Sequence, residues 1–125
     1  MHDTAMDANE GAETTSPEAQ EDNQPPAEPQ PEVETVDTRL ARTVATLLVA
    51  KGVKVLALDF DKTIVSVHTA GFWRQGTPNL AEHVRPCFKA LIEAALDTKL
   101  HVCVVTYSMQ PMLIRDVLKL VLPKW

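Results

Sequence analysis

Two aspartates close an apolar stretch of this sequence, and their spacing suits phosphoryl-transfer chemistry. Asp59 and Asp61 stand at the end of the branched, apolar run that covers residues 54–60. A carboxylate can attack a phosphate ester once a divalent cation cancels the repulsion between the two negative groups. A second carboxyl group nearby can protonate the leaving alkoxide and later activate water. The pair therefore predicts a nucleophile at Asp59 and a general acid and base at Asp61.

Two strands are needed to position these groups. Continuous apolar runs rich in branched residues are typical of strands buried on both faces of a parallel sheet, and the chain has two, at residues 54–60 and 100–106. The second run ends at Thr106, whose hydroxyl group can hold a phosphoryl oxygen. Ligands collect at the carboxyl ends of parallel strands. We therefore expect Thr106 to lie beside Asp59 and Asp61.

Helices are expected before, between and after the two strands. Apolar residues recur at helical spacing in residues 38–51, in residues 86–97 and in the segment after Ser108. Asp37 or Thr38 can cap the first helix, and Ser108 can cap the third. The third helix is expected to turn five apolar residues inward: Met112, Ile114, Val117, Leu118 and Val121. This order of helices and strands predicts an α/β fold built on a parallel sheet.

The segment between the first strand and the second helix shows no clean period. Residues 62–78 are interpreted as an extended loop or flap, and residues 79–84 as a short helical turn. Phe72 and Trp73 lie in the middle of this flap. They either floor a substrate pocket or pack the flap onto the core, and the sequence leaves both readings open.

The spacing Asp59-x-Asp61-x-Thr63 after an apolar strand resembles the first motif of the haloacid-dehalogenase superfamily, and the strand ending at Thr106 resembles its second motif. Residues 53–122 are similar to small phosphatase-like members of that superfamily. The resemblance implies a Rossmann-like parallel sheet and an aspartyl-phosphate intermediate on Asp59. It also implies a Mg²⁺ ion held by the Asp59 carboxylate and the main-chain carbonyl of Asp61. Thr106 and Thr63 would then hold the substrate phosphate, although support of the loop is the favoured role of Thr63.

Two further elements of the resembled family have no counterpart in this chain. They are a lysine that neutralises the nucleophile and the phosphoryl group, and an acidic pair that completes the Mg²⁺ shell. After Ser108 the chain offers only four charged residues: Arg115, Asp116, Lys119 and Lys124. We therefore expect an incomplete, N-terminal portion of the fold that does not turn over substrate by itself. The alternative, from another functional class, is a non-catalytic interaction module with an acidic binding tail.

Several residues near the two aspartates have structural alternatives. Asp59 and Asp61 can simply cap a turn by accepting hydrogen bonds from backbone N–H groups. Lys62 either meets a phosphate or stays exposed. Three histidines show no metal-ligand spacing and are assigned to structural or surface roles: His68, His83 and His101.

Charge divides the chain into two parts. Residues 1–38 contain 11 of the 17 acidic residues, five of the nine prolines and no lysine or arginine. Such a segment cannot bury enough apolar surface to fold, so we predict a disordered acidic tail. Residues 39–125 contain all 12 basic residues and are assigned to the α/β domain.

The sequence also bounds setting and partners. No apolar run reaches the roughly 20 residues that span a membrane, and no secretory signal is present, which favours a cytoplasmic or nuclear setting. Cys87 and Cys103 are expected to be reduced and buried.

The basic residues are scattered and have no aromatic residues between them, which argues against nucleic-acid binding. The expected partners are a phosphorylated small molecule or protein, and a protein or second copy that covers the open edge of residues 55–60.

Overall fold

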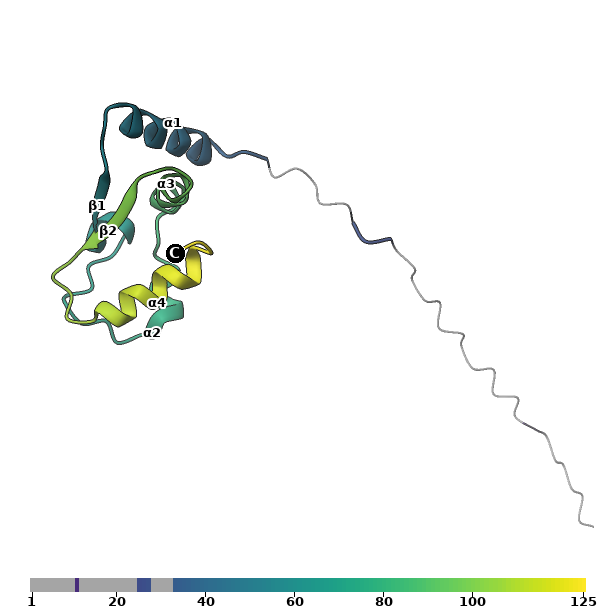
Figure 1. Cartoon of the computed structure of the whole chain (residues 1–125). Coiled ribbons are helices and arrows are strands. Elements are labelled where there is room, and N and C mark those ends of the chain that lie inside the picture. Colours follow the sequence, from purple (N-terminus) through teal and green to yellow (C-terminus); the bar gives the residue numbers. More distant parts are fainter. Residues whose placement is uncertain (1–10, 12–24, 28–32) are drawn as a thin grey trace, which may run out of the picture. The chain divides into compact units, whose positions relative to one another are not determined.

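The computed structural model describes residue 11, residues 25–27 and residues 33–125 (Figure 1). Most of the predicted disordered tail, residues 1–38, lies outside the described residues, and its last three residues belong to a helix rather than to a tail. The segment Glu32–Trp125 forms one compact unit. None of the described helices is long and apolar enough to cross a membrane.

Helix α1, Val36–Ala50, begins earlier than its apolar pattern predicts. The hydroxyl group of Thr35 accepts a hydrogen bond from the N–H of Thr38 at 3.1 Å, so Thr35 is the cap rather than Asp37 or Thr38. The small side chains of Ala41 and Ala45 are the buried residues of this helix, and they let α1 approach helix α3 closely.

Strands β1, Val55–Asp59, and β2, His101–Val105, pair in parallel. The register runs from Val55 opposite His101 to Asp59 opposite Val105. The connection between them carries helix α2, Gly76–Ala81, and helix α3, Pro86–Leu96, and helix α4, Pro111–Val121, follows β2. The described chain is therefore a mixed α/β structure with a small, two-stranded parallel sheet.

The prediction that both strands are buried on both faces is wrong. Leu56, Leu58, Val102 and Val104 face the helices and join the hydrophobic core. The alternate residues are exposed, and they form what we call the outer face of the sheet: Val55, Ala57, Asp59, His101, Cys103 and Val105. In Figure 1 the helices lie on one side of the sheet. No element of the described residues covers the other side.

The two cysteines also differ from expectation. Cys87 and Cys103 are free thiols, but both are exposed rather than buried. Cys103 belongs to the outer face of the sheet, and Cys87 lies in the first turn of α3. Cys103 is exposed because no element of the described residues covers that face, whereas Cys87 stands at the exposed N-terminal end of α3.

The main core lies between the inner face of the sheet and helices α2, α3 and α4. Its largest fully buried side chains come from the strand end, the loop and all three helices: Phe60, Ile64, Val65, Leu80, Ile92, Val117, Leu118 and Leu122. Helix α4 turns Ile114 inward as predicted. Met112, expected to face inward, is 60% exposed because it lies on the opposite side of α4.

The segment predicted as a flap is more structured than expected. A tight turn, Phe60–Ile64, follows β1 directly. Val65 forms an antiparallel bridge with Val84, and the carbonyl of Ile64 accepts a hydrogen bond from the N–H of Arg85 at 2.8 Å. Helix α2 begins at Gly76 rather than at residue 79. These bonds tie the start of the loop to the segment just before α3.

Candidate functional site

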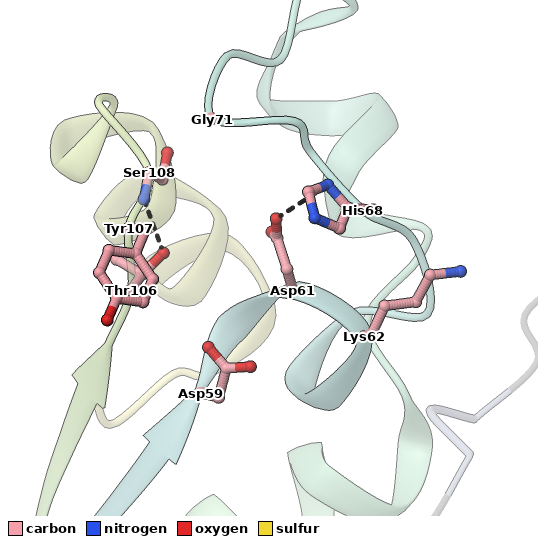
Figure 2. Close-up of a pocket in the computed structure, with 8 residues that line it drawn as sticks. All are labelled: Asp59, Asp61, Lys62, His68, Gly71, Thr106, Tyr107 and Ser108. Atoms are coloured by element: carbon pink, nitrogen blue, oxygen red, sulfur yellow. Dashed lines mark hydrogen bonds and ion pairs between the residues drawn. The ribbon is translucent and has the colours of Figure 1, made fainter.

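A cavity of about 260 Å³ opens where the two parallel strands end (Figure 2). Eight residues from β1, the loop and the segment after β2 line it: Asp59, Asp61, Lys62, His68, Gly71, Thr106, Tyr107 and Ser108. The structure therefore brings Asp59, Asp61 and Thr106 together at one edge of the sheet. Parallel pairing puts both carboxyl ends at that edge, which is why residues 45 or more positions apart meet there.

The backbone after β1 directs both aspartates to the cavity. Phe60, between them, is fully buried in the core, so the alternation of an extended chain turns Asp59 and Asp61 the other way. Asp61 still has an extended conformation, with ψ of 134°, and Lys62 then adopts a left-handed one, with φ of 56°. The chain reverses there, and the N–H of Lys62 donates a hydrogen bond to the carbonyl of Val67 at 3.0 Å.

Asp61 is held by the loop. Its Oδ2 accepts a hydrogen bond from the N–H of Thr69 at 3.1 Å, and the Thr69 hydroxyl lies 2.8 Å from Oδ1 and 2.9 Å from Oδ2. The Asp61 side chain is 21% exposed, so water still reaches it from the cavity. Both oxygens thus contact a single residue, and the carboxyl plane is fixed relative to the loop.

Asp59 has the opposite surroundings. Its side chain is exposed, and within the described residues it makes neither a hydrogen bond nor an ion pair. Lys62 lines the same cavity, but Figure 2 shows its side chain extending away from both carboxylates. The carboxylate therefore keeps its lone pairs available, either to attack an electrophile or to bind a cation.

His68 is a site residue that the sequence did not indicate. Its Nδ1 lies 3.6 Å from Asp61 Oδ2, and the same nitrogen accepts a hydrogen bond from the N–H of Ala70 at 2.8 Å. One nitrogen cannot accept that proton and also donate to Asp61. The shorter contact with Ala70 is the hydrogen bond, so His68 contacts Asp61 without forming a charged pair in this geometry.

The segment after β2 supplies hydroxyl groups. Thr106 Oγ1 accepts a hydrogen bond from the N–H of Ser108 at 3.0 Å, and Ser108 Oγ accepts one from the N–H of Gln110 at 3.1 Å. The prediction that Ser108 caps the third helix is wrong, because Gln110 is the residue at the cap position; Ser108 instead supports the approach to α4. Because both hydroxyl oxygens act as acceptors here, their hydrogens remain available for an anionic ligand.

Thr63 is not brought into the cavity. It lies half-buried in the turn Phe60–Ile64 and is absent from the cavity lining. Its position favours support of the loop over contact with a substrate phosphate. Two of the histidines assigned to structural or surface roles have different surroundings. His83 packs edge-on against Trp73 with ring centres 5.9 Å apart, whereas His101 is exposed on the outer face of the sheet.

The two aromatic residues of the loop have separate roles. Trp73 packs against the main core. The side-chain amide of Gln110 forms hydrogen bonds with the main-chain N–H and the main-chain carbonyl of Trp73. Phe72 is exposed, with the Arg74 guanidinium 5.7 Å from its ring centre. Of the two readings left open by the sequence, packing onto the core therefore describes Trp73. Neither residue lines the cavity.

The donor set at the strand end fits part of a Mg²⁺ site. Magnesium takes oxygen ligands in proteins, commonly one or two carboxylates, with water and substrate phosphate completing the shell. The unpaired Asp59 carboxylate is such a ligand, and the main-chain carbonyl of Asp61 is two residues away. No group of three or more His, Cys, Asp or Glu side chains suited to a metal occurs in the described part of the chain. The Asp61 carboxylate is already engaged by Thr69.

Comparisons with known proteins found no relative of this chain. Neither the family models, nor the curated proteins, nor the solved structures compared with this chain give a match. Any function must therefore be argued from the residues and geometry of the cavity itself.

Proposed function

We propose that this chain carries the nucleophile half of a Mg²⁺-dependent phosphatase site of the haloacid-dehalogenase type. The observation that carries the proposal is the meeting of Asp59, Asp61 and Thr106 at the carboxyl ends of two paired parallel strands. The fold proposed with it is the N-terminal portion of a Rossmann-like domain. The proposed substrate is a phosphate ester of a small molecule or a protein.

In the first step, a carboxylate oxygen of Asp59 forms a bond to phosphorus and the ester P–O bond breaks. Asp61 gives its proton to the departing alkoxide. In the second step, Asp61 takes a proton from water, the water oxygen bonds to phosphorus, and the bond to Asp59 breaks. The exposure of Asp59 suits the attack, and the fixed carboxyl group of Asp61 suits transfer to an oxygen in the cavity.

The hydroxyl groups of Thr106 and Ser108 would donate to phosphoryl oxygens, since both line the cavity and keep a hydrogen to give. A bound Mg²⁺ ion would supply the charge neutralisation that lets one anion attack another. The residues to hold it are Asp59, by its carboxylate, and Asp61, by its main-chain carbonyl.

One missing contact limits the activity we expect. Within the described residues, no lysine or arginine nitrogen lies within ion-pair distance of the Asp59 carboxylate. Lys62 lines the cavity but extends away from both carboxylates, so a phosphoryl group bound to Asp59 would lack a lysine contact that neutralises it. We expect residues 1–125 alone to bind phosphate analogues and not to complete many turnovers.

A test that requires no turnover is the formation of a beryllofluoride adduct, which mimics a phosphoryl group on a carboxylate. Fluorine NMR of the full chain with beryllium, fluoride and Mg²⁺ should show a bound resonance that disappears in Asp59→Asn. Asp116→Asn, an exposed aspartate on α4, is the matched control and should keep the signal. An adduct that survives Asp59→Asn would show that the nucleophile is assigned to the wrong residue.

Asp61 has a separate kinetic signature in any form of the protein that hydrolyses aryl phosphates. Asp61→Asn should slow hydrolysis by about 10²–10⁴-fold for poor leaving groups, which need a proton as they depart. Good leaving groups should be affected much less. An equal loss for both kinds of substrate would show that Asp61 is not the general acid.

The second candidate is a non-catalytic interaction module. The uncovered outer face of the sheet favours it, because parallel sheets are normally covered on both sides. On this hypothesis the strand ends are structural and the acidic residues 1–38 serve as a binding arm. Failure of the beryllofluoride test, together with association through the outer face, would favour the module over the enzyme.

A further inference from the structure

Thr69 is the one buried polar side chain of the described residues, with 4% of its surface exposed. Its hydroxyl group lies within 2.9 Å of both carboxylate oxygens of Asp61, and its N–H donates to Oδ2 at 3.1 Å. A buried polar group usually has a partner that satisfies it. Here that partner is the proposed acid of the site rather than a backbone group of the loop.

The turn that follows Thr69 has a backbone conformation that is unusual for an alanine. Ala70 and Gly71 both have positive φ, 54° and 78°, and the N–H of Phe72 bonds the carbonyl of Thr69 at 3.1 Å. Positive φ at both central residues is the signature of a tight turn of type I′. The left-handed conformation is disfavoured for alanine because of its Cβ atom. The surrounding contacts must therefore impose this turn on Ala70.

The turn is also tied to the other side of the cavity. The carbonyl of Gly71 accepts a hydrogen bond from the N–H of Met109 at 3.0 Å, and Met109 lies between β2 and α4. Trp73 lies two residues after Gly71. The side-chain amide of Gln110 accepts a hydrogen bond from the main-chain N–H of Trp73 and donates one to its main-chain carbonyl. Thr69 is thus connected to Asp61 at the end of β1 and, through its turn, to the segment that carries Thr106.

We propose that Thr69 is a positioning residue that fixes the orientation of the Asp61 carboxyl group toward the cavity; this inference rests on the proposed function. In the proposed reaction Asp61 carries a proton at one stage and lacks it at the next. A hydroxyl group can donate to a carboxylate and accept from a carboxylic acid without moving its oxygen. Thr69 therefore holds Asp61 in one orientation through both stages, which an aliphatic side chain could not do.

The orientation of Asp61 can be measured on the full chain by NMR, through the three-bond couplings that report its χ1 angle. The unaltered chain should show a single Asp61 rotamer. Thr69→Val keeps the shape and the main-chain N–H but removes the hydroxyl, and should give an averaged coupling. Thr69→Ser restores the hydroxyl and should restore the single rotamer. Thr46→Val, an exposed threonine on α1, is the matched control and should match the unaltered chain.

A second measurement examines the same contact from the side of Thr69. Its amide should exchange with solvent about tenfold faster in Asp61→Ala, because the hydrogen bond to a charged acceptor is lost. Asp59→Asn should leave that exchange unchanged. An Asp61 rotamer that is indifferent to Thr69→Val, or a Thr69 amide that is indifferent to Asp61→Ala, would overturn the proposal.

These outcomes separate the two proposals. An ordered, Thr69-dependent Asp61 without a beryllofluoride adduct on Asp59 would remove the phosphatase function and keep the positioning role. An adduct on Asp59 together with an Asp61 that ignores Thr69 would do the reverse.

Discussion

The two faces of the sheet both carry branched apolar residues but have opposite surroundings. The inner face presents Leu56, Leu58, Val102 and Val104 to the helices. On the outer face, Val55 and Val105 are apolar and branched too, yet they are 54% and 59% exposed. At these two positions, residue type does not separate the two faces. The faces differ because helices cover only one of them. An apolar strand residue therefore shows that a side chain can be buried, but not whether another element covers it.

The largest expected effect tests the inner face. Leu58→Ala removes a side chain that is 8% exposed and contacts the main core, so it should lower the free energy of unfolding by about 2–5 kcal/mol. Val55→Ala, on the same strand, should change it by less than about 0.5 kcal/mol. Urea unfolding with an unchanged m-value measures both. Equal losses for the two variants would mean that the faces are not different.

The second prediction concerns association through the outer face. An exposed apolar face beside unpaired strand edges favours contact with another chain. We expect the apparent molar mass to rise above 13.8 kDa with concentration, and Val105→Lys to reduce that rise. Val36→Lys, at an exposed valine outside the sheet, is the control. Light scattering over a concentration series provides the measurement, and a monomer at every concentration would contradict the prediction.

The smallest expected effect is a difference in the rate at which the two thiols are modified. Cys103 is on the outer face, so a thiol reagent should modify it in the folded chain about as fast as in urea. Its reaction should slow at concentrations where the chain associates, whereas Cys87 on α3 should react at the same rate throughout. Mass spectrometry after timed alkylation distinguishes the two thiols. Slow modification of Cys103 in dilute solution would show that the outer face is covered.

Much of the fold could be predicted because its signals are local. Two apolar runs gave both strands within one residue of their ends, and Pro86 marked the start of α3. The errors arose where the answer depends on distant residues. Met112 suits an inward position by type, but the direction in which α4 faces is decided by α2 and the core. The α1 cap was displaced because Thr35, Asp37 and Thr38 each carry a side-chain oxygen that can accept a hydrogen bond from an N–H two or three residues further on.

The site divides in the same way. Asp59, Asp61 and Thr106 were predictable because each stands at the end of an apolar run, and parallel pairing brings such ends together. Thr69 and His68 were missed because the loop must fold back before either reaches Asp61. The sequence did hold a weak signal in Ala70-Gly71, since a glycine after a small residue is compatible with a tight turn. Nothing local indicates that the residue before such a turn bonds a carboxylate.

Tyr107 gives the cavity a reporter of its own. It is the only tyrosine in the chain, it is fully exposed, and it stands at the mouth of the cavity beside Thr106 (Figure 2). Both tryptophans lie elsewhere, at positions 73 and 125, and neither lines the cavity. Ultraviolet difference absorption or the ring signals of one residue can therefore follow ligand entry without any label. A molecule that fills the space between Asp59 and Thr106 must also change the solvent around that single phenol ring.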